Sequence, residues 1–221
     1  MSSAERIALF DADGRAVGAD KRANAYARGE RVGLVFVWAI WTDAAGVGHM
    51  LLQTRGRAGD PYLGSLDAAA GGHIGEGEHP DQAAAREFSE EVGIPLESDE
   101  LVYLGHCALE DTRAGTPRRA MQFFYACTRP INLSEAVFSE EVSAFVQVTL
   151  DDFTALADGT AAEIAGTVRR ATAADHTEPV AVASTAFAAY SPPIMDAIRR
   201  SARALRHLLN HGTADHSIWQ R

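Results

Sequence analysis

Three glutamates, Glu87, Glu90 and Glu91, stand at positions i, i+3 and i+4 and are the residues of this chain best suited to chemistry. On a helix this spacing places the three side chains on one face, with β-carbons within about 6 Å of one another. Because adjacent carboxylates repel, such a cluster is tolerated on a solvated surface or around a hard divalent cation. The spacing therefore permits either a solvated acidic face or a site for Mg²⁺, which takes oxygen ligands and keeps waters that phosphates can replace.

The segment that carries these glutamates has the start and stop signals of a helix. Pro80 suits a first helical turn, and Gly93 suits the position just past the last turn. Between them, the residues from Ala83 to Glu87 are strong helix formers. The sequence therefore predicts a helix from about Pro80 to Val92.

A glycine-rich segment directly precedes this helix and contains Gly71, Gly72, Gly75 and Gly77. A loop with so few β-carbons can bring backbone carbonyls and amides close to a metal ion or a phosphate. Glycines alone are typical of an ordinary turn. Joined to a helix with three acids at helical spacing, they favour a loop-helix unit that grips a metal-bound diphosphate.

This unit resembles the conserved box of the Nudix family at every position, and in this chain the box reads Gly72-x5-Glu78-x7-Arg86-Glu87-Phe88-x-Glu90-Glu91-x-Gly93-Ile94. The resemblance implies that Glu87 and Glu91 are the principal ligands of Mg²⁺ or Mn²⁺, with Glu90 in or near the same shell. It also implies that the carbonyl of Gly71 joins the metal ligands. Phe88 departs slightly from the family, in which this position is more often aliphatic, and the departure affects packing under the helix only.

Two further box residues, Glu78 and Arg86, are implied by the resemblance to support the geometry of the loop and helix by ion pairing. The general base varies among Nudix enzymes and comes from the box helix or from a later loop. Here Glu90 is the first candidate. Glu140 and Glu141, which precede a predicted strand, are the later-loop alternatives, and their ordinary role would be loop solubility.

Hydrolysis of a diphosphate linkage in a small, potentially nucleoside, diphosphate derivative is the reaction that the box favours. Metal ions neutralise phosphate charge and lower the pKa of a bound water, while a carboxylate accepts the proton as that water attacks phosphorus. Such catalysis needs only the groups that the box supplies.

Two alternatives belong to other classes. Stretches outside the box resemble the Nudix branch related to isopentenyl diphosphate isomerase, which suggests isomerisation of an allylic diphosphate. Those isomerases use a cysteine in the segment before the box, where this chain has 66–70 without cysteine, and a His-Arg pair where Glu30-Arg31 stands here. The third hypothesis is a non-catalytic nucleotide-binding module, but such modules usually lose box carboxylates and this chain keeps them all.

Composition places the chain among ordinary globular proteins, with 221 residues, 47% hydrophobic and 23% charged. A formal net charge of -10 argues against a broad grip on a nucleic acid backbone, so we expect a small-molecule substrate. No apolar run has membrane-spanning length, and the first residues lack the pattern of a signal peptide. We therefore expect no membrane partner and a cytoplasmic protein.

The hydrophobic pattern predicts a mixed sheet with helices on both sides over residues 1–153, and this α/β/α sandwich is the fold that the resemblance to the Nudix family implies for a Nudix domain there. An amino-terminal hairpin is expected around residues 7–18, with Asp13-Gly14 at its turn. Six further strands are predicted from buried or alternating runs, at residues 32–41, 50–54, 66–70, 101–107, 121–128 and 145–150. Arg113, Arg118 and Arg119 fall between two of these strands and are interpreted as loop residues that either meet phosphates or face solvent.

Residues 154–221 are alanine-rich and are predicted to form a helical extension. Ser191-Pro192-Pro193 is a helix start signal, and an apolar stripe at helical spacing follows it, formed by Ile194, Ile198, Ala202, Leu205 and Leu209. We expect this helix to pack on the domain or to form part of a homodimer interface. The arginines between the stripe positions are interpreted as a solvated face.

Overall fold

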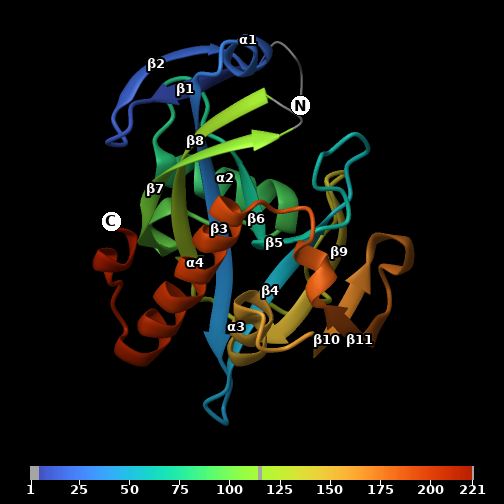
Figure 1. The fold of residues 1–221 in the computed structure, drawn as a ribbon. Helices are drawn as coiled ribbons and strands as arrows, with labels where there is room; N and C mark the ends of the chain where they lie inside the picture. The colour runs from blue at the N-terminus through green and yellow to red at the C-terminus, as the bar shows by residue number, and fades with distance from the viewer. Residues whose placement is uncertain (1–4, 114–115, 221) are drawn as a thin grey trace.

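The computed structural model describes residues 5–113 and 116–220 and shows a mixed β-sheet with helices on both faces (Figure 1). This arrangement confirms the α/β/α sandwich predicted from the sequence. Within the described ranges the sheet has eleven strands. They are β1 (Arg6–Phe10), β2 (Ala16–Lys21), β3 (Arg31–Thr42), β4 (Gly48–Arg55), β5 (Leu66–Asp67), β6 (Ala70–His73), β7 (Leu101–Arg113), β8 (Thr116–Cys127), β9 (Val142–Thr149), β10 (Glu163–Arg170) and β11 (Thr177–Ala183).

The helices divide between the two faces of the sheet. Helix α2 covers one face, while α3 and α4 cover the other, and α1 lies beside the amino-terminal hairpin (Figure 1). No helix of the described chain is long and apolar enough to cross a membrane. The α-helices are α1 (Arg22–Ala27), α2 (Pro80–Val92), α3 (Leu150–Asp158) and α4 (Pro192–His211), and the single-turn 3-10 helices are η1 (Ser98–Glu100), η2 (Ala171–Ala173), η3 (Ser184–Phe187) and η4 (His216–Trp219).

Strand β3 is the centre of the sheet and brings the glycine-rich segment beside the long hairpin β7–β8. Along one edge β3 pairs antiparallel with β6 and β4, and along the other it pairs in parallel with β8. Leu34 therefore lies between His73 of β6 and Gln122 of β8, and Phe36 lies between Gly71 and Phe124. These two sets of cross-strand neighbours therefore extend from β6, next to the box, across β3 to β8.

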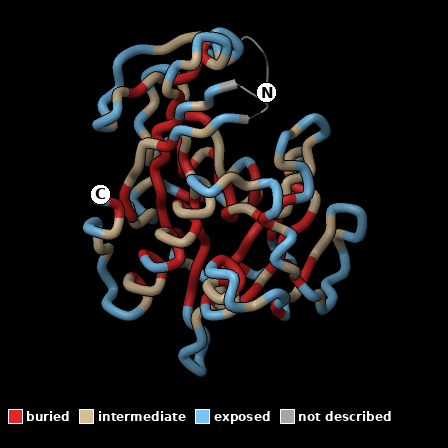
Figure 2. Tube along the Cα trace, viewed as in Figure 1, coloured by how far each residue is buried: buried red, intermediate tan, exposed pale blue. Residues whose placement is uncertain are grey.

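Alternation along the strands separates two hydrophobic cores. Even-numbered residues of β3 and β8, such as Trp38 and Phe124, face α3 and α4, whereas odd-numbered ones, such as Val35 and Phe123, face α2. Figure 2 shows the buried residues concentrated along the central strands, which both cores share. The box helix and the carboxy-terminal helix thus lie on opposite faces of the same strands.

The box helix α2 has the bounds that the sequence predicts. Pro80 occupies its first turn, and the backbone N–H of His79 donates to the Gln82 side chain at 3.1 Å, which caps the start. Gly93 ends the helix in the left-handed conformation at φ 73° and donates to the Ser89 carbonyl. Both ends are local signals, which explains why this prediction was accurate.

Several strands differ in extent from their predictions. The predicted strand at 66–70 is divided into β5 and β6, and the hairpin β7–β8 is longer at its turn than the apolar runs indicated. Arg118 and Arg119 consequently lie on β8, where they pair with β7, and the loop interpretation was wrong. The amino-terminal hairpin β1–β2 is confirmed, with Gly14 at positive φ in its turn.

The residues after α3 contain more than a helix. Strand β10 pairs antiparallel with β9, and β11 pairs with β10, so this segment extends the sheet at one edge. Helix α4 then packs across the face, and the stripe residues Ile198, Ala202 and Leu205 are buried in the same core as Met50 and Leu52. Two of its four arginines contact α3, since the Arg206 Nη1 atom lies 2.5 Å from the Asp151 Oδ1 and Arg199 donates to the Ala157 carbonyl. Arg203 is exposed, as the solvated-face interpretation expects.

Candidate active site

Two of the three clustered glutamates point from α2 into the protein beneath β6. Glu87 and Glu91, one helical turn apart, have exposed fractions of 1% and 4%. Gly72 lies directly above Glu87, and a β-carbon added at Gly72 would overlap the Glu87 carboxylate. The glycine is therefore required for the strand to approach the helix this closely.

Glu91 is held by donors from two different strands. Its Oε2 atom accepts hydrogen bonds from the Gly71 N–H and from the Gln53 Nε2 of β4, both at 2.8 Å. Sequence reasoning did not identify Gln53. A glutamine within the apolar run of β4 was the available signal, since a polar residue facing a core needs a partner.

Arg86 connects the glycine-rich loop to the helix. Its Nε and Nη2 atoms donate to the two carboxylate oxygens of Glu78 at 2.8 and 3.0 Å, and Nη1 donates to Glu87 at 2.9 Å. Nη2 also donates to the His73 carbonyl at the end of β6. The Gly75 N–H donates to Glu78 as well, so one bidentate pair joins the loop to α2.

The buried carboxyl groups are electrostatically unfavourable when charged. Burial raises the pKa of Glu87 to about 7; the charge and hydrogen bond of Arg86 partly offset this rise, and the charges of Glu90 and Glu141 add smaller upward contributions. Burial likewise raises the pKa of Glu91 to about 8, with a contribution from the charge of Glu87. For Glu78, burial acts in the same direction, but the hydrogen bonds from Arg86 and Gly75 leave its pKa lowered. A cation near Glu87 and Glu91 would stabilise their ionised forms.

Glu90 occupies a different environment from its two neighbours. Its side chain is 58% exposed, and the Arg86 Nη1 atom lies 3.5 Å from its Oε2. The three acids therefore do not converge equally, because α2 turns Glu87 and Glu91 towards β6 and leaves Glu90 at the protein surface. Glu90 remains within reach of Arg86 and hence beside the buried pair.

Glu140 and Glu141, the two candidates for a general base from the later loop, differ in their position relative to the site. Glu141 lines a cavity that adjoins the box and forms an ion pair with Arg57 at 2.7 Å between Nη1 and Oε1. Glu140 is exposed and is not part of the cavity lining. Gly71 lines the cavity, so its backbone lies between the buried carboxylates and the open space.

The donor set around Gly71 and Gly72 suits a hard divalent cation. Its groups are carboxylate and backbone oxygens, the ligand type that Mg²⁺ and Mn²⁺ prefer. Across residues 5–113 and 116–220, no three acidic, histidine or cysteine side chains are gathered as a ready-made metal cage. Arg86 supplies the compensating positive charge to Glu87 instead. The residues thus fit the cation by chemistry and by charge, with Glu87 and Glu91 as the groups that would hold it.

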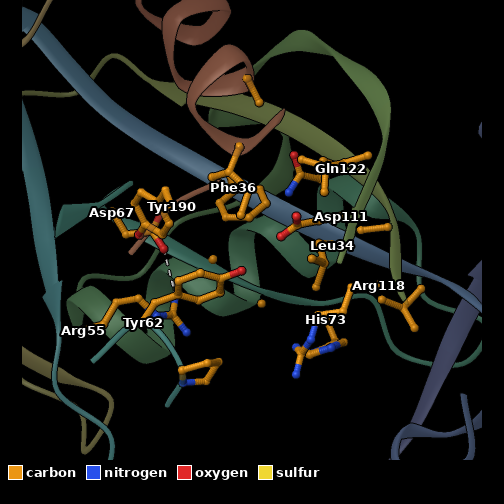
Figure 3. Close-up of a pocket in the computed structure, with 18 of the residues that line it drawn as sticks. Leu34, Phe36, Arg55, Tyr62, Asp67, His73, Asp111, Arg118, Gln122 and Tyr190 are labelled. Carbon is orange, nitrogen blue, oxygen red and sulfur yellow. Dashed lines mark hydrogen bonds and ion pairs between the residues drawn. The ribbon is translucent and has the colours of Figure 1, made fainter. Parts of the chain in front are cut away.

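A cavity of about 210 Å³ adjoins the box on the α4 side of the sheet (Figure 3). Gly71, Gly72 and His73 form one end. Residues of β3 and β8 form its floor, and Ile194, Ala197 and Ile198 of α4 border it from above. The helix of the carboxy-terminal segment therefore helps to build the space next to the box.

One wall of this cavity combines ion pairs and aromatic rings. Arg55 contacts Asp60 at 2.6 Å and Asp67 at 2.9 Å between its guanidinium nitrogens and their carboxylate oxygens. The rings of Tyr62 and Tyr190 are 5.1 Å apart, and the Tyr190 hydroxyl donates to the Leu66 carbonyl at 2.9 Å. Figure 3 shows Arg55, Asp67 and the two tyrosines grouped at one side of the space. Tyr62 and Tyr190 both line the cavity.

His73, at the end of β6, forms part of the opposite rim. Its Nε2 atom lies 2.8 Å from the Tyr26 hydroxyl of α1. Burial, together with the positive charges of Arg22, Arg55 and Arg86, lowers the pKa of His73 to about 3. The imidazole is therefore neutral at physiological pH, and the Tyr26 contact attaches the amino-terminal region to the glycine strand.

Comparison with known proteins agrees with the box and the sheet. The family profile described as the NUDIX domain matches residues 34–170, and this chain belongs to the Nudix family. An uncharacterized Nudix hydrolase of Streptomyces coelicolor is 42% identical over 94 residues, covering 42% of this chain and 50% of the relative. Nudix hydrolase 3 of Arabidopsis thaliana is 28% identical over 119 residues, covering 52% of this chain and 15% of that protein.

Among solved structures, DR0079 from Deinococcus radiodurans shares the fold with a TM-score of 0.51 and 20% identity. The match covers 70% of this chain and 90% of that one. The two curated relatives are matched over at most half of their own lengths. The comparisons therefore establish the family and the fold.

Proposed function

We propose that this protein is a metal-dependent pyrophosphohydrolase that cleaves a diphosphate linkage in a small organic diphosphate. The observation that carries the proposal is the pair of buried carboxylates, Glu87 and Glu91, held beneath Gly71 and Gly72 at the end of a cavity. Burying two acids side by side is costly unless a cation or protons compensate their charge. A cation held by these two acids could also bind the phosphate oxygens of a substrate, which is the function we propose for the buried pair.

In this reaction the oxygen of water bonds to phosphorus, the bridging phosphorus–oxygen bond breaks, and a carboxylate accepts the proton of the water. A bound Mg²⁺ or Mn²⁺ would neutralise phosphate charge and lower the pKa of a coordinated water. Glu87 and Glu91 would hold the cation, while Arg86 and Glu78 keep α2 aligned with the glycine-rich loop. The Gly71–Gly72 backbone would let the diphosphate approach without obstruction from a β-carbon.

Glu90 and Glu141 are the two candidates for the base. Glu90 is at the surface beside the buried pair, so it can exchange a proton with solvent. Glu141 lines the cavity, but its carboxylate is engaged in an ion pair with Arg57 at 2.7 Å. Glu90 stays the first choice, because its weaker contact with Arg86 leaves its oxygens available to a water molecule.

The test is hydrolysis of a panel of nucleoside diphosphate derivatives, dinucleotides, coenzyme A and isopentenyl diphosphate, with Mg²⁺, with Mn²⁺ and with EDTA. We expect phosphate products that require the metal and contain oxygen from labelled water. Formation of dimethylallyl diphosphate would instead favour an isomerase, and tight binding without turnover would favour a non-catalytic module.

Replacement of Glu91 by glutamine keeps its shape but removes the charge that would hold the cation. We expect Glu91→Gln to reduce kcat/KM by about 100-fold or more while the circular dichroism spectrum is retained. The matched control is Glu163→Gln, at an exposed position of β10, which should have wild-type activity. Unchanged turnover in Glu91→Gln would contradict the site. Glu90→Gln and Glu141→Gln, assayed in the same series, distinguish the two candidate bases.

A further inference from the structure

Gln122 of β8 is a buried polar residue without the partner that its position requires. It is 6% exposed, it lines the cavity, and its Oε1 atom has no hydrogen-bond partner within the described chain. Buried side-chain acceptors are nearly always satisfied by protein or by water. An unpaired buried acceptor on a residue that lines a cavity is therefore a position to which a ligand can donate.

The strand pattern directs Gln122 towards this space. Ala120, Gln122 and Phe124 alternate onto the face of β8 that looks towards α4, while Met121 and Phe123 belong to the core beneath α2. Figure 3 shows the Gln122 amide beside Phe36 and Asp111, across the cavity from Arg55 and Tyr62. An aliphatic residue would fill this position without leaving an unpaired polar atom, so packing does not explain a glutamine.

A second unpaired group lies on the same floor. Trp38 lines the cavity and is 3% exposed, and its Nε1 donor also has no partner in the described chain. Between these two polar groups the floor is apolar, formed by Leu34, Phe36 and Phe124. This floor thus combines apolar surface with the unpaired Gln122 acceptor and the unpaired Trp38 donor, which suits a largely apolar or aromatic group with a polar edge.

The distance from the box is appropriate for a group attached to a diphosphate. Leu34 pairs with His73 on one side and with Gln122 on the other. Because neighbouring strands are about 4.8 Å apart, Gln122 lies roughly 10 Å from the end of the glycine strand. A diphosphate at Gly71 and Gly72 would therefore place an attached ring system over Leu34 and Phe36, with its far edge near Gln122.

We propose that Gln122 is a specificity-determining residue, whose Oε1 atom accepts a hydrogen bond from an N–H or O–H of the organic group joined to the diphosphate. The inference rests on the proposed function, since it places the diphosphate of the substrate at the box. Sites built to hydrogen-bond a substrate donor reject analogues that lack it, because the protein group is then buried unpaired. Because of Gln122, the protein should therefore prefer a substrate that carries this donor over an analogue that differs only in lacking it.

The experiment compares two pairs of probes, each of which differs by one amino group: ADP with purine riboside 5′-diphosphate, and GDP with IDP. Hydrolysis is measured as kcat/KM, and binding is measured by calorimetry in EDTA. For the wild-type protein we expect one pair to differ by about 10-fold or more in favour of the amino compound. In Gln122→Met this ratio should fall to within about threefold, and in Gln122→Glu, which keeps an acceptor, it should be partly restored.

The matched control is Gln147→Met, another strand glutamine that is not part of the cavity lining. It should keep the wild-type ratio, and all variants should show the wild-type circular dichroism spectrum. If the probes bind with the expected ratio but are not cleaved, the inference stands and the proposed hydrolysis of these compounds fails. Equal values within both pairs for the wild-type protein, or a ratio that survives in Gln122→Met, would overturn the role of Gln122.

Discussion

At the scale of single residues, the site depends on two carboxyl groups that are already buried in the protein without a bound cation. Glu87 and Glu91 are almost inaccessible, and Arg86 provides the nearest positive charge to Glu87. Gln53 and Gly71 orient Glu91 through its Oε2 atom. The two acids are therefore held in position to bind a cation, but their ionisation is unfavourable while they are buried. Metal binding is consequently linked to the loss of their protons.

This linkage predicts how the stability of the metal-free protein changes with pH. Burial raises the pKa values of Glu87 and Glu91 to about 7 and about 8, above the ordinary value of 4.5. The folded state therefore binds protons more tightly than the unfolded state. The stabilisation is fully present below about pH 4.5 and is lost as pH rises through 7 to 8.

In EDTA we therefore expect the contribution of these carboxyls to Tm to fall between pH 6 and pH 8.5, and excess Mg²⁺ to raise Tm more at pH 8.5 than at pH 6. Differential scanning calorimetry measures both effects. The control is the double variant Glu87→Gln, Glu91→Gln, in which the difference between the two pH values should shrink. An Mg²⁺ effect as large in the double variant as in the wild-type protein would contradict the assignment.

At the scale of elements, the end of α2 determines how the box helix meets the rest of the protein. Gly93 adopts φ 73°, and a β-carbon added there would overlap the side chain of Val137. The Val137 N–H donates to the Val92 carbonyl at 2.8 Å, so the segment before β9 is attached to this helix end. Glycine at this position allows both the turn and the contact.

Gly93→Ala should consequently destabilise the protein through two effects. The left-handed backbone costs roughly 1 kcal/mol for alanine, and the collision with Val137 adds about 1–3 kcal/mol. Gly212 ends α4 at φ 70° with open space around it, so Gly212→Ala isolates the backbone effect alone. Urea unfolding should show a larger loss for Gly93→Ala, and equal losses would show that Val137 moves aside without cost.

At the scale of the whole molecule, the segment after α3 shares one core with the central sheet. Leu205 and Ala202 of α4 belong to the same buried cluster as Met50 and Leu52, and β10 continues the sheet from β9. The cavity beside the box is likewise bordered by both parts of the chain. We propose that the segment from residue 154 onward folds together with the Nudix domain as one cooperative unit.

Leu205→Ala tests this proposal, because Leu205 is fully buried between α4 and the sheet. We expect a loss of roughly 2–5 kcal/mol in the free energy of unfolding. The transition should remain single and should coincide for circular dichroism and tryptophan fluorescence. Leu63→Ala, at a side chain that is 57% exposed, should change stability by less than about 0.5 kcal/mol. Two separate transitions in Leu205→Ala would indicate that α4 unfolds independently.

Features with local causes could be predicted from the sequence. Pro80, Gly93 and the alanine run define α2 within its own segment, and Asp13-Gly14 defines a turn. The strand pair β10–β11 was missed although it carries β-branched residues such as Ile164 and Val182, because Gly166, Pro179 and the alanine-rich surroundings weaken the strand pattern. The pairing of β10 with β9 and of β11 with β10 determines this region. Gln53 and Gln122 were also missed, although a glutamine inside an apolar strand was a visible signal for both.

The sequence alone determined the family resemblance, the box helix and the acids that it carries, because these depend on spacing within a few turns of chain. Only the tertiary structure decided which acids are buried, since the approach of β6 to α2 covers Glu87 and Glu91 and leaves Glu90 at the surface. It also decided that α4 borders the cavity and that Gln122 faces it. Those outcomes depend on contacts between separate segments of the chain, such as the one between Gly71 and Glu91, which are 20 residues apart. No local pattern encodes such contacts.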